Sequence, residues 1–217
     1  GRILAPKVAS RLGRSLLELG GNNAAIVCKS ADLDLTIKGI TFSAAGTAGQ
    51  RCTSLRRLFV HADILEEVVS KVKNSFEELK IGDPMDRNIQ VGPLISEQSF
   101  YQMQEKLDSC KAMGLKVTGG DRLDNPDGFF VTPALVEVSE HIDEMNEETF
   151  APILYVMPFT DLRAAIALQN SVKQGLSSSI FTNDVRESEL FLSSEGSDCG
   201  IATVSYTHLR AHETILD

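Results

Sequence analysis

Apolar and polar residues follow one another along this chain in blocks, some spaced like helices and others like short strands. Between residues 64 and 79 the apolar positions recur every three or four residues, so they would share one face of a helix that Asp63 caps. Short apolar runs bounded by turn residues predict strands. The pattern predicts helices over 2–13, 33–46, 64–79, 96–113, 162–168 and 185–194, and strands over 16–19, 24–28, 58–60, 131–138, 153–159, 178–182 and 201–204.

The order of these elements predicts the class of fold. Strands that alternate with helices of this length are typical of βαβ units, which build a parallel sheet with right-handed crossovers. The sequence contains no internal repeat, low-complexity segment or clear linker. We therefore expect an α/β fold in which most of the chain forms one parallel-sheet domain.

Charge and composition exclude several classes of protein. The 217 residues carry a net charge of -9, and the nearest thing to a basic cluster is Arg51 with Arg56 and Arg57. That cluster is too short for a nucleic-acid surface, which needs many clustered cations. No apolar run approaches the roughly 20 residues that span a bilayer. We expect a protein of a cytoplasmic-type compartment that binds neither nucleic acid nor membrane.

The cysteines and histidines do not predict a metal site. The cysteines have no CxxC spacing, so neither a zinc site nor a dense disulfide framework is indicated. His208 and His212 are four residues apart, but no Glu follows His208 as the zinc-protease motif requires. The four cysteines are Cys28, Cys52, Cys110 and Cys199.

Glu18 is the first residue with candidate chemistry. It lies in the segment Leu-Glu-Leu-Gly-Gly-Asn-Asn, residues 17–23, within an apolar run and before a glycine pair. An apolar setting disfavours the charged carboxylate and raises its pKa, which suits a general base near neutral pH. The alternative is a strand-end glutamate that turns to solvent.

Cys52 is the second candidate. Small residues crowd the segment before it, residues 46–54, and would leave room for a substrate beside the thiol. Arg51 adjoins the thiol and would favour the thiolate, which is the nucleophilic form. The alternative is a buried cysteine at a tightly packed helix end, since cysteine is among the most buried residue types.

Taken in order, these segments resemble the aldehyde dehydrogenase family. Leu-Glu-Leu-Gly-Gly and Gly-Gln-Arg-Cys resemble its two signature motifs, and Cys52 follows Glu18 by the typical 34 residues (52 − 18). Glu-Thr-Phe-Ala-Pro, residues 148–152, resembles a third motif, and residues 175–182 resemble a late strand segment. The sequence from Gly1 to about Val204 looks closest to the α-aminoadipic semialdehyde dehydrogenase subfamily.

The resemblance implies a mechanism and a set of roles. Cys52 would attack the aldehyde carbon, and the thiohemiacetal would be oxidised by NAD(P)⁺ to a thioester that water hydrolyses to the acid. Glu18 would be the general base, and the Cys52 N–H would donate to the oxyanion. Glu148 would bind the nicotinamide ribose, Phe150 would pack near it, and Leu19 would hold the nicotinamide amide through its backbone.

The same resemblance implies boundaries and partners. Residues 1–20 would end a coenzyme-binding domain that lies mostly upstream, and residues 21–204 would form the catalytic domain. Residues 205–217 depart from the family pattern, so we expect a non-native tail there. The parent protein would be a homo-oligomer (dimer or tetramer) in the cytoplasm or a mitochondrial matrix, and this chain alone would be inactive. NAD is the expected cofactor, with NADP as the alternative.

The substrate remains an expectation with open alternatives. A guanidinium at Arg51 would pair with the distal carboxylate of a semialdehyde such as α-aminoadipic semialdehyde, as in lysine catabolism. Equally, Arg51 would only tune Cys52 or pair with a structural carboxylate. Two other functions stay open: a coenzyme-independent thioester or ester hydrolase, and a catalytically inert fragment.

Overall fold

The computed structural model describes residues 1–125, 127–173 and 175–206, and a single sheet of seven strands organises them. Its order is β3-β4-β5-β2-β1-β6-β7, and every neighbouring pair is parallel except β3 with β4. The strands are β1 Asn23–Val27, β2 Leu55–His61, β3 Lys116–Thr118, β4 Ala134–Glu137, β5 Ile153–Phe159, β6 Ser177–Phe181 and β7 Ile201–Val204.

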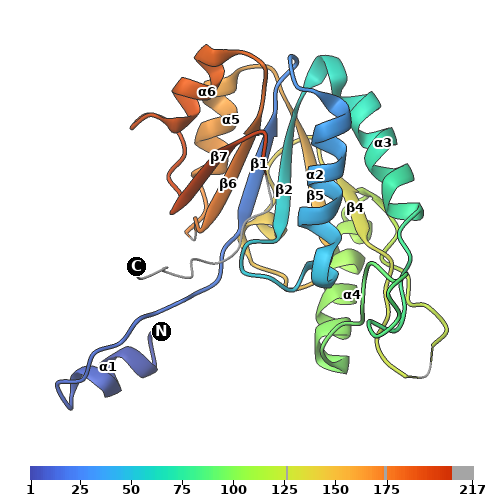
Figure 1. Ribbon diagram of the computed structural model, residues 1–217, viewed down its shortest axis with the longest axis vertical. Coiled ribbons are helices and arrows are strands. Elements are labelled where there is room, and N and C mark those ends of the chain that lie inside the picture. Colours follow the sequence, from blue (N-terminus) through green and yellow to red (C-terminus); the bar gives the residue numbers. More distant parts are fainter. Residues whose placement is uncertain (126, 174, 207–217) are drawn as a thin grey trace.

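Helices follow most of the parallel strands, as the alternating pattern predicts. In Figure 1, α2 and α3 lie side by side in front of the sheet, while α5 contacts β1 and β5. Asp32, Ser96, Asp161 and Asp184 cap their helices with side-chain oxygens. The helices are α1 Leu4–Ala9, α2 Leu33–Ala45, α3 Leu65–Glu77, α4 Glu97–Ala112, α5 Leu162–Gln169 and α6 Val185–Leu192, with short 3-10 turns at Gly46–Gly49, Ala62–Ile64 and Asp143–Asn146.

The core lies between the sheet and these helices. All five residues of β1 are buried, and six of the seven residues in β2 are buried as well. Strands buried on both faces carry apolar runs, which is why β1 and the centre of β2, residues 58–60, were predictable from sequence. Because β1 and β2 are central and buried, the segments that lead into them adjoin the packed core.

The first 19 residues lie outside this core. Helix α1 buries no residue, and Figure 1 shows it away from the sheet at the end of an extended segment. The predicted strand over 16–19 is wrong, because that segment pairs with no strand and Leu16 is 83% exposed. The predicted helix over 2–13 shortens to α1, since Gly13 and the residues before it turn back on Val8.

Two further expectations need correction. The sheet is not wholly parallel, because β3 was missed and pairs antiparallel with β4 at one edge. Three residues with a partly exposed pattern give too weak a signal to predict such a strand. Asp63 does not cap α3, because it lies inside a 3-10 turn that His61 caps. The expected tail over 205–217 lies outside the described residues from 207 onward, as do His208 and His212.

Candidate active site

The three motif segments meet at the end of the sheet where its central parallel strands begin. The glycine pair leads into β1, the segment with Cys52 leads into β2, and the segment with Glu148 leads into β5. Since β5, β2 and β1 are adjacent and parallel, their amino ends lie together. Topology therefore brings together segments that are separated by up to about 130 residues in sequence.

The segment around the thiol, residues 46–54, is called the thiol loop below. Its first part is a left-handed turn, because Thr47, Ala48 and Gly49 all have positive φ. Two non-glycine residues in that region carry strain that the surrounding packing must hold. At Gly49 a side chain is excluded, since a Cβ there would lie 2.5 Å from the carbonyl group of Ala151.

Cys52 is half-buried, and its backbone is fixed from the β1 side. The buried amide of Asn23 donates to the carbonyl oxygens of Cys52 at 2.7 Å and Ser54 at 2.9 Å. Its amide oxygen accepts from the backbone N–H of Ser177 at 2.9 Å. Asn23 therefore links the thiol loop to the starts of β1 and β6.

Glu148 belongs to a segment, residues 147–152, called the Glu148 loop below. Its carboxylate accepts from the Gly21 N–H at 3.2 Å and lies 3.5 Å from the Arg56 guanidinium. A Cβ on Gly20 would overlap that carboxylate, and a Cβ on Gly21 would lie 2.8 Å from the Cys52 carbonyl oxygen. Gly21 therefore leaves no room for a side chain beside the thiol loop, whereas at Gly20 the neighbouring atom is the flexible end of the Glu148 side chain.

Arg56 is a charged residue at the centre of this junction. Its side chain is 3% exposed, and burial lowers the pKa of its guanidinium, an effect that the charges of Glu148 and Cys52 oppose. The Phe150 ring, itself 44% exposed, lies 5.3 Å from that guanidinium. Arg56 consequently stands between the thiol and the predicted coenzyme residues.

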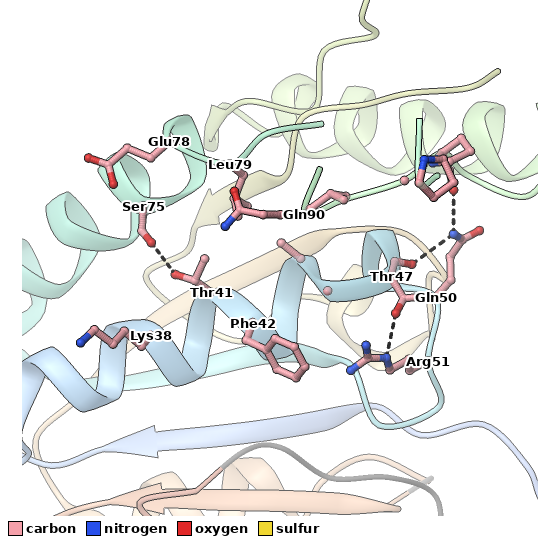
Figure 2. Close-up of a pocket in the computed structure, with 16 residues that line it drawn as sticks. Lys38, Thr41, Phe42, Thr47, Gln50, Arg51, Ser75, Glu78, Leu79 and Gln90 are labelled. Carbon is pink, nitrogen blue, oxygen red and sulfur yellow. Dashed lines mark hydrogen bonds between the residues drawn. The ribbon is translucent and has the colours of Figure 1, made fainter. Parts of the chain in front are cut away.

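Arg51 points away from this junction into a second space. Its guanidinium donates to the Thr47 hydroxyl at 2.8 Å and lies 5.0 Å from the centre of the Phe42 ring. Figure 2 shows these residues at one side of a cavity of about 830 Å³ between α2, α3 and the segment 84–93. Cys52 does not line that cavity, so the structure places Arg51 in it without the thiol.

Glu18 and Leu19 are not gathered with the other predicted residues. The Glu18 side chain is exposed and makes no hydrogen bond or ion pair with any described residue. The described residues do not surround Glu18 with the apolar environment that the sequence analysis expected. Leu19 beside it is 53% exposed. Glu148 and Phe150 lie together instead, on a cavity of about 430 Å³ that α4 also borders.

Reasoning from sequence missed Arg56, Asn23 and the left-handed turn. Arg56 and Arg57 were interpreted only as a short basic cluster, although both lie in an apolar strand and are 2% and 1% exposed. A pair of arginines inside such a strand was the available signal, because a buried charge needs several partners. Among the described residues no group of three His, Cys, Asp or Glu could hold a metal ion, and no helix is long and apolar enough to cross a membrane.

Comparison with known proteins gives a consistent family match. The model of the "Aldehyde dehydrogenase family" matches residues 1–214. Alpha-aminoadipic semialdehyde dehydrogenase of Mus musculus is 44% identical over 207 residues, which cover 94% of this chain and 38% of that protein. Aldehyde dehydrogenase family 7 member A1 of Pisum sativum is 44% identical over 206 residues, 94% of this chain and 40% of its own length.

Solved structures give the same result for the fold. Lactaldehyde dehydrogenase from Escherichia coli superimposes with a TM-score of 0.90 at 30% identity, over 97% of this chain and 44% of that one. Betaine aldehyde dehydrogenase from Staphylococcus aureus, solved with NAD⁺, gives 0.90 at 25% identity, over 97% and 42%. The chain thus spans about two fifths of the length of the proteins it matches.

Proposed function

Because the chain belongs to the aldehyde dehydrogenase family, we propose that the protein containing it oxidises an aldehyde to an acid through Cys52. The observation that carries the proposal is the junction of the three motifs, in which Glu148 contacts both Gly21 and Arg56. Arg56 in turn bonds to the thiol loop. Chance similarity in three short segments would not bring them into contact.

The thiol performs the covalent step. The Cys52 thiolate forms a bond to the aldehyde carbon, and the carbonyl oxygen of the substrate becomes an oxyanion that the Cys52 backbone N–H stabilises. Oxidation of that adduct leaves a thioester on Cys52. Glu18 then takes a proton from water, the water oxygen bonds to the acyl carbon, and the carbon–sulfur bond breaks to release the acid and the thiolate.

The residues present fit NAD(P)⁺ as the oxidant. Glu148 presents a carboxylate whose side chain is 25% exposed, next to the exposed ring of Phe150, on the 430 Å³ cavity. A carboxylate is a suitable acceptor for ribose hydroxyl groups. When bound, NAD(P)⁺ supplies the acceptor for the hydride that leaves the aldehyde carbon. Leu19 would contribute its backbone to the nicotinamide amide.

The role of Glu18 rests on its motif. It requires the N-terminal segment that carries Glu18, residues 1–20, called the arm here, to approach the thiol. Exposed leucines on that arm, at 16, 17 and 19, support the proposal that residues 1–20 belong with a coenzyme domain and residues 21–204 with the catalytic domain. The resemblance also supports a homo-oligomeric parent protein in the cytoplasm or the mitochondrial matrix.

Glu18→Gln tests this mechanism in the parent protein, meaning this chain with any residues that flank it in its gene. Without the base, a thioester should accumulate on Cys52 during turnover with NAD⁺ and aldehyde. Mass spectrometry of the Cys52 peptide would show the added acyl group in the variant and not in the wild type. Full turnover without an accumulated adduct would exclude Glu18 as the base.

For the substrate we propose a semialdehyde that carries a carboxylate. The mouse relative is named for such a compound, and Arg51 offers a guanidinium on the 830 Å³ cavity. Because Cys52 does not line that cavity, the proposal requires a substrate that extends from the thiol into it. Arg51→Ala should lower kcat/KM for α-aminoadipic semialdehyde far more than for a neutral aldehyde of equal length. Equal losses for the two would mean that Arg51, held by Thr47 and Phe42, only shapes the loop.

A further inference from the structure

We propose that Arg56 is a positioning residue that clamps the thiol loop to the Glu148 loop and so fixes the distance between the nucleophile and the coenzyme residues. The inference deepens the proposed function, because the two loops carry its nucleophile and its ribose ligand. It rests on contacts of this side chain with both loops.

The guanidinium divides its donors between the two loops. Nη2 donates to the carbonyl oxygens of Gly49 and Arg51 in the thiol loop, each at 3.2 Å. Nη1 donates to the carbonyl oxygens of Thr149 at 2.5 Å and Ala151 at 3.4 Å in the Glu148 loop. Neither loop can shift against the other without breaking bonds to one nitrogen of the same rigid plane.

Charge and packing hold the guanidinium between the loops. Glu148 lies 3.5 Å from Nη2, and the Phe150 ring lies 5.3 Å from the guanidinium carbon. Its Nε is buried and makes no hydrogen bond within the described part of the chain. A buried cation with partners on both sides is costly to move, because any displacement leaves it less well compensated.

Lysine cannot replace this arrangement. An ammonium has three donors around one atom, whereas the guanidinium has five in a fixed plane and can reach carbonyls on two sides. Arg56→Lys keeps the charge but breaks the link between the two loops, so both loops should loosen. The neighbouring Arg57 provides a matched control, because it is equally buried in β2 and bonds to the carbonyl oxygens of Asn22, Leu168 and Gln169, outside both loops.

Hydrogen–deuterium exchange of the parent protein tests the clamp without any turnover. In Arg56→Lys, peptides covering residues 46–54 and 147–152 should both exchange about tenfold faster than in the wild type. In Arg57→Lys, peptides from residues 165–170 should loosen while both loops stay within about twofold of the wild type. Loosening of neither loop in Arg56→Lys, or equal loosening by the two variants, would overturn the proposal.

A second variant covers the case in which Arg56→Lys does not fold. Phe150 is exposed and lies against Arg56, so Phe150→Leu should leave the core intact and remove only the ring beneath the guanidinium. The clamp predicts faster exchange in the thiol loop of this variant. An unchanged thiol loop there would contradict transmission through Arg56.

Coenzyme affinity separates this inference from the proposed function. Isothermal titration should show NAD⁺ binding about tenfold weaker in Arg56→Lys and nearly unchanged in Arg57→Lys. A wild type that binds NAD⁺ but oxidises no aldehyde would refute the proposed function and leave the clamp supported if the exchange pattern holds. Normal turnover in Arg56→Lys with both loops still protected would refute the clamp alone.

Discussion

Replacing Gly49 by Ala tests how closely the thiol loop packs against the Glu148 loop, and Gly114 supplies a matched control. Both glycines have left-handed backbones, with φ of +66° and +77°. A Cβ on Gly114 would meet nothing within 4 Å. A Cβ on Gly49 would lie 2.5 Å from the carbonyl carbon and oxygen of Ala151 and 2.7 Å from the nitrogen of Pro152.

The two substitutions should lower the free energy of unfolding by different amounts, and the difference should come only from the steric overlap at Gly49. A left-handed L-residue costs about 1–2 kcal/mol, and the stiffer unfolded chain offsets about 0.4–1 kcal/mol of that. Gly114→Ala should therefore lower the free energy of unfolding by about 0.5–1 kcal/mol. Gly49→Ala adds an overlap with backbone that no side-chain rotation relieves, which brings its total to about 2–4 kcal/mol.

Thermal unfolding followed by circular dichroism measures the difference. One kcal/mol shifts Tm by about 2–4 °C in a protein of some 200 residues, so Gly49→Ala should lower Tm by about 4–15 °C and Gly114→Ala by at most about 4 °C. Equal Tm values for the two variants would refute the tight contact between the loops. A second substitution, Ala151→Gly, should not restore the Tm of Gly49→Ala, because the added Cβ meets backbone atoms of Ala151 and not its side chain.

Three other predictions concern groups around the site and the core. Asn23→Leu should destabilise the protein by about 2–4 kcal/mol, because it leaves the carbonyl oxygens of Cys52 and Ser54 and the N–H of Ser177 without their side-chain partner; an unchanged urea midpoint would contradict this. Iodoacetamide should modify half-buried Cys52 before Cys28, since burial raises the pKa of the Cys28 thiol, and peptide mapping that found equal rates would contradict it. Burial raises the pKa of the Glu137 carboxyl group, but its bonds to Lys73 and a second lysine lower that pKa by more. The ionised carboxylate therefore stabilises the fold at pH values above its ordinary pKa. This stabilisation is lost as pH falls through the lowered pKa of the folded state. Glu137→Gln should therefore cost about 0.5–1 kcal/mol at pH 7 and progressively less below about pH 4, where an unchanged deficit would refute the charge effect.

Much of the fold was predictable from the sequence because its central elements are buried. The strands β1 and β5 follow strong apolar patterns, and the helices after β1, β5 and β6 begin at side-chain caps. The segment 16–19 was misassigned because three leucines in four residues look like a short strand wherever they lie. Its leucines are exposed here, so their pattern does not reflect packing within the described residues.

The site was predictable as a set of motifs and not as a set of contacts. Cys52 and Glu148 were singled out because their sequence segments resemble a family, and topology explains why their loops meet. The pair of arginines in β2 was a signal of buried charge that the sequence analysis did not use, and the partners of Arg56 could not be predicted because they are mostly backbone carbonyls, which carry no sequence signal. The close approach of Gly49 to Ala151 likewise depends on tertiary structure that a single sequence does not encode locally.

The central claim is that Cys52 is the nucleophile of an aldehyde dehydrogenase. The most direct test is NADH formation by the parent protein with α-aminoadipic semialdehyde, comparing Cys52→Ala with Cys199→Ala, a second cysteine of intermediate exposure. Cys52→Ala should abolish NADH formation, and Cys199→Ala should retain it. Full turnover by Cys52→Ala would contradict the account, because the nucleophile would then lie elsewhere.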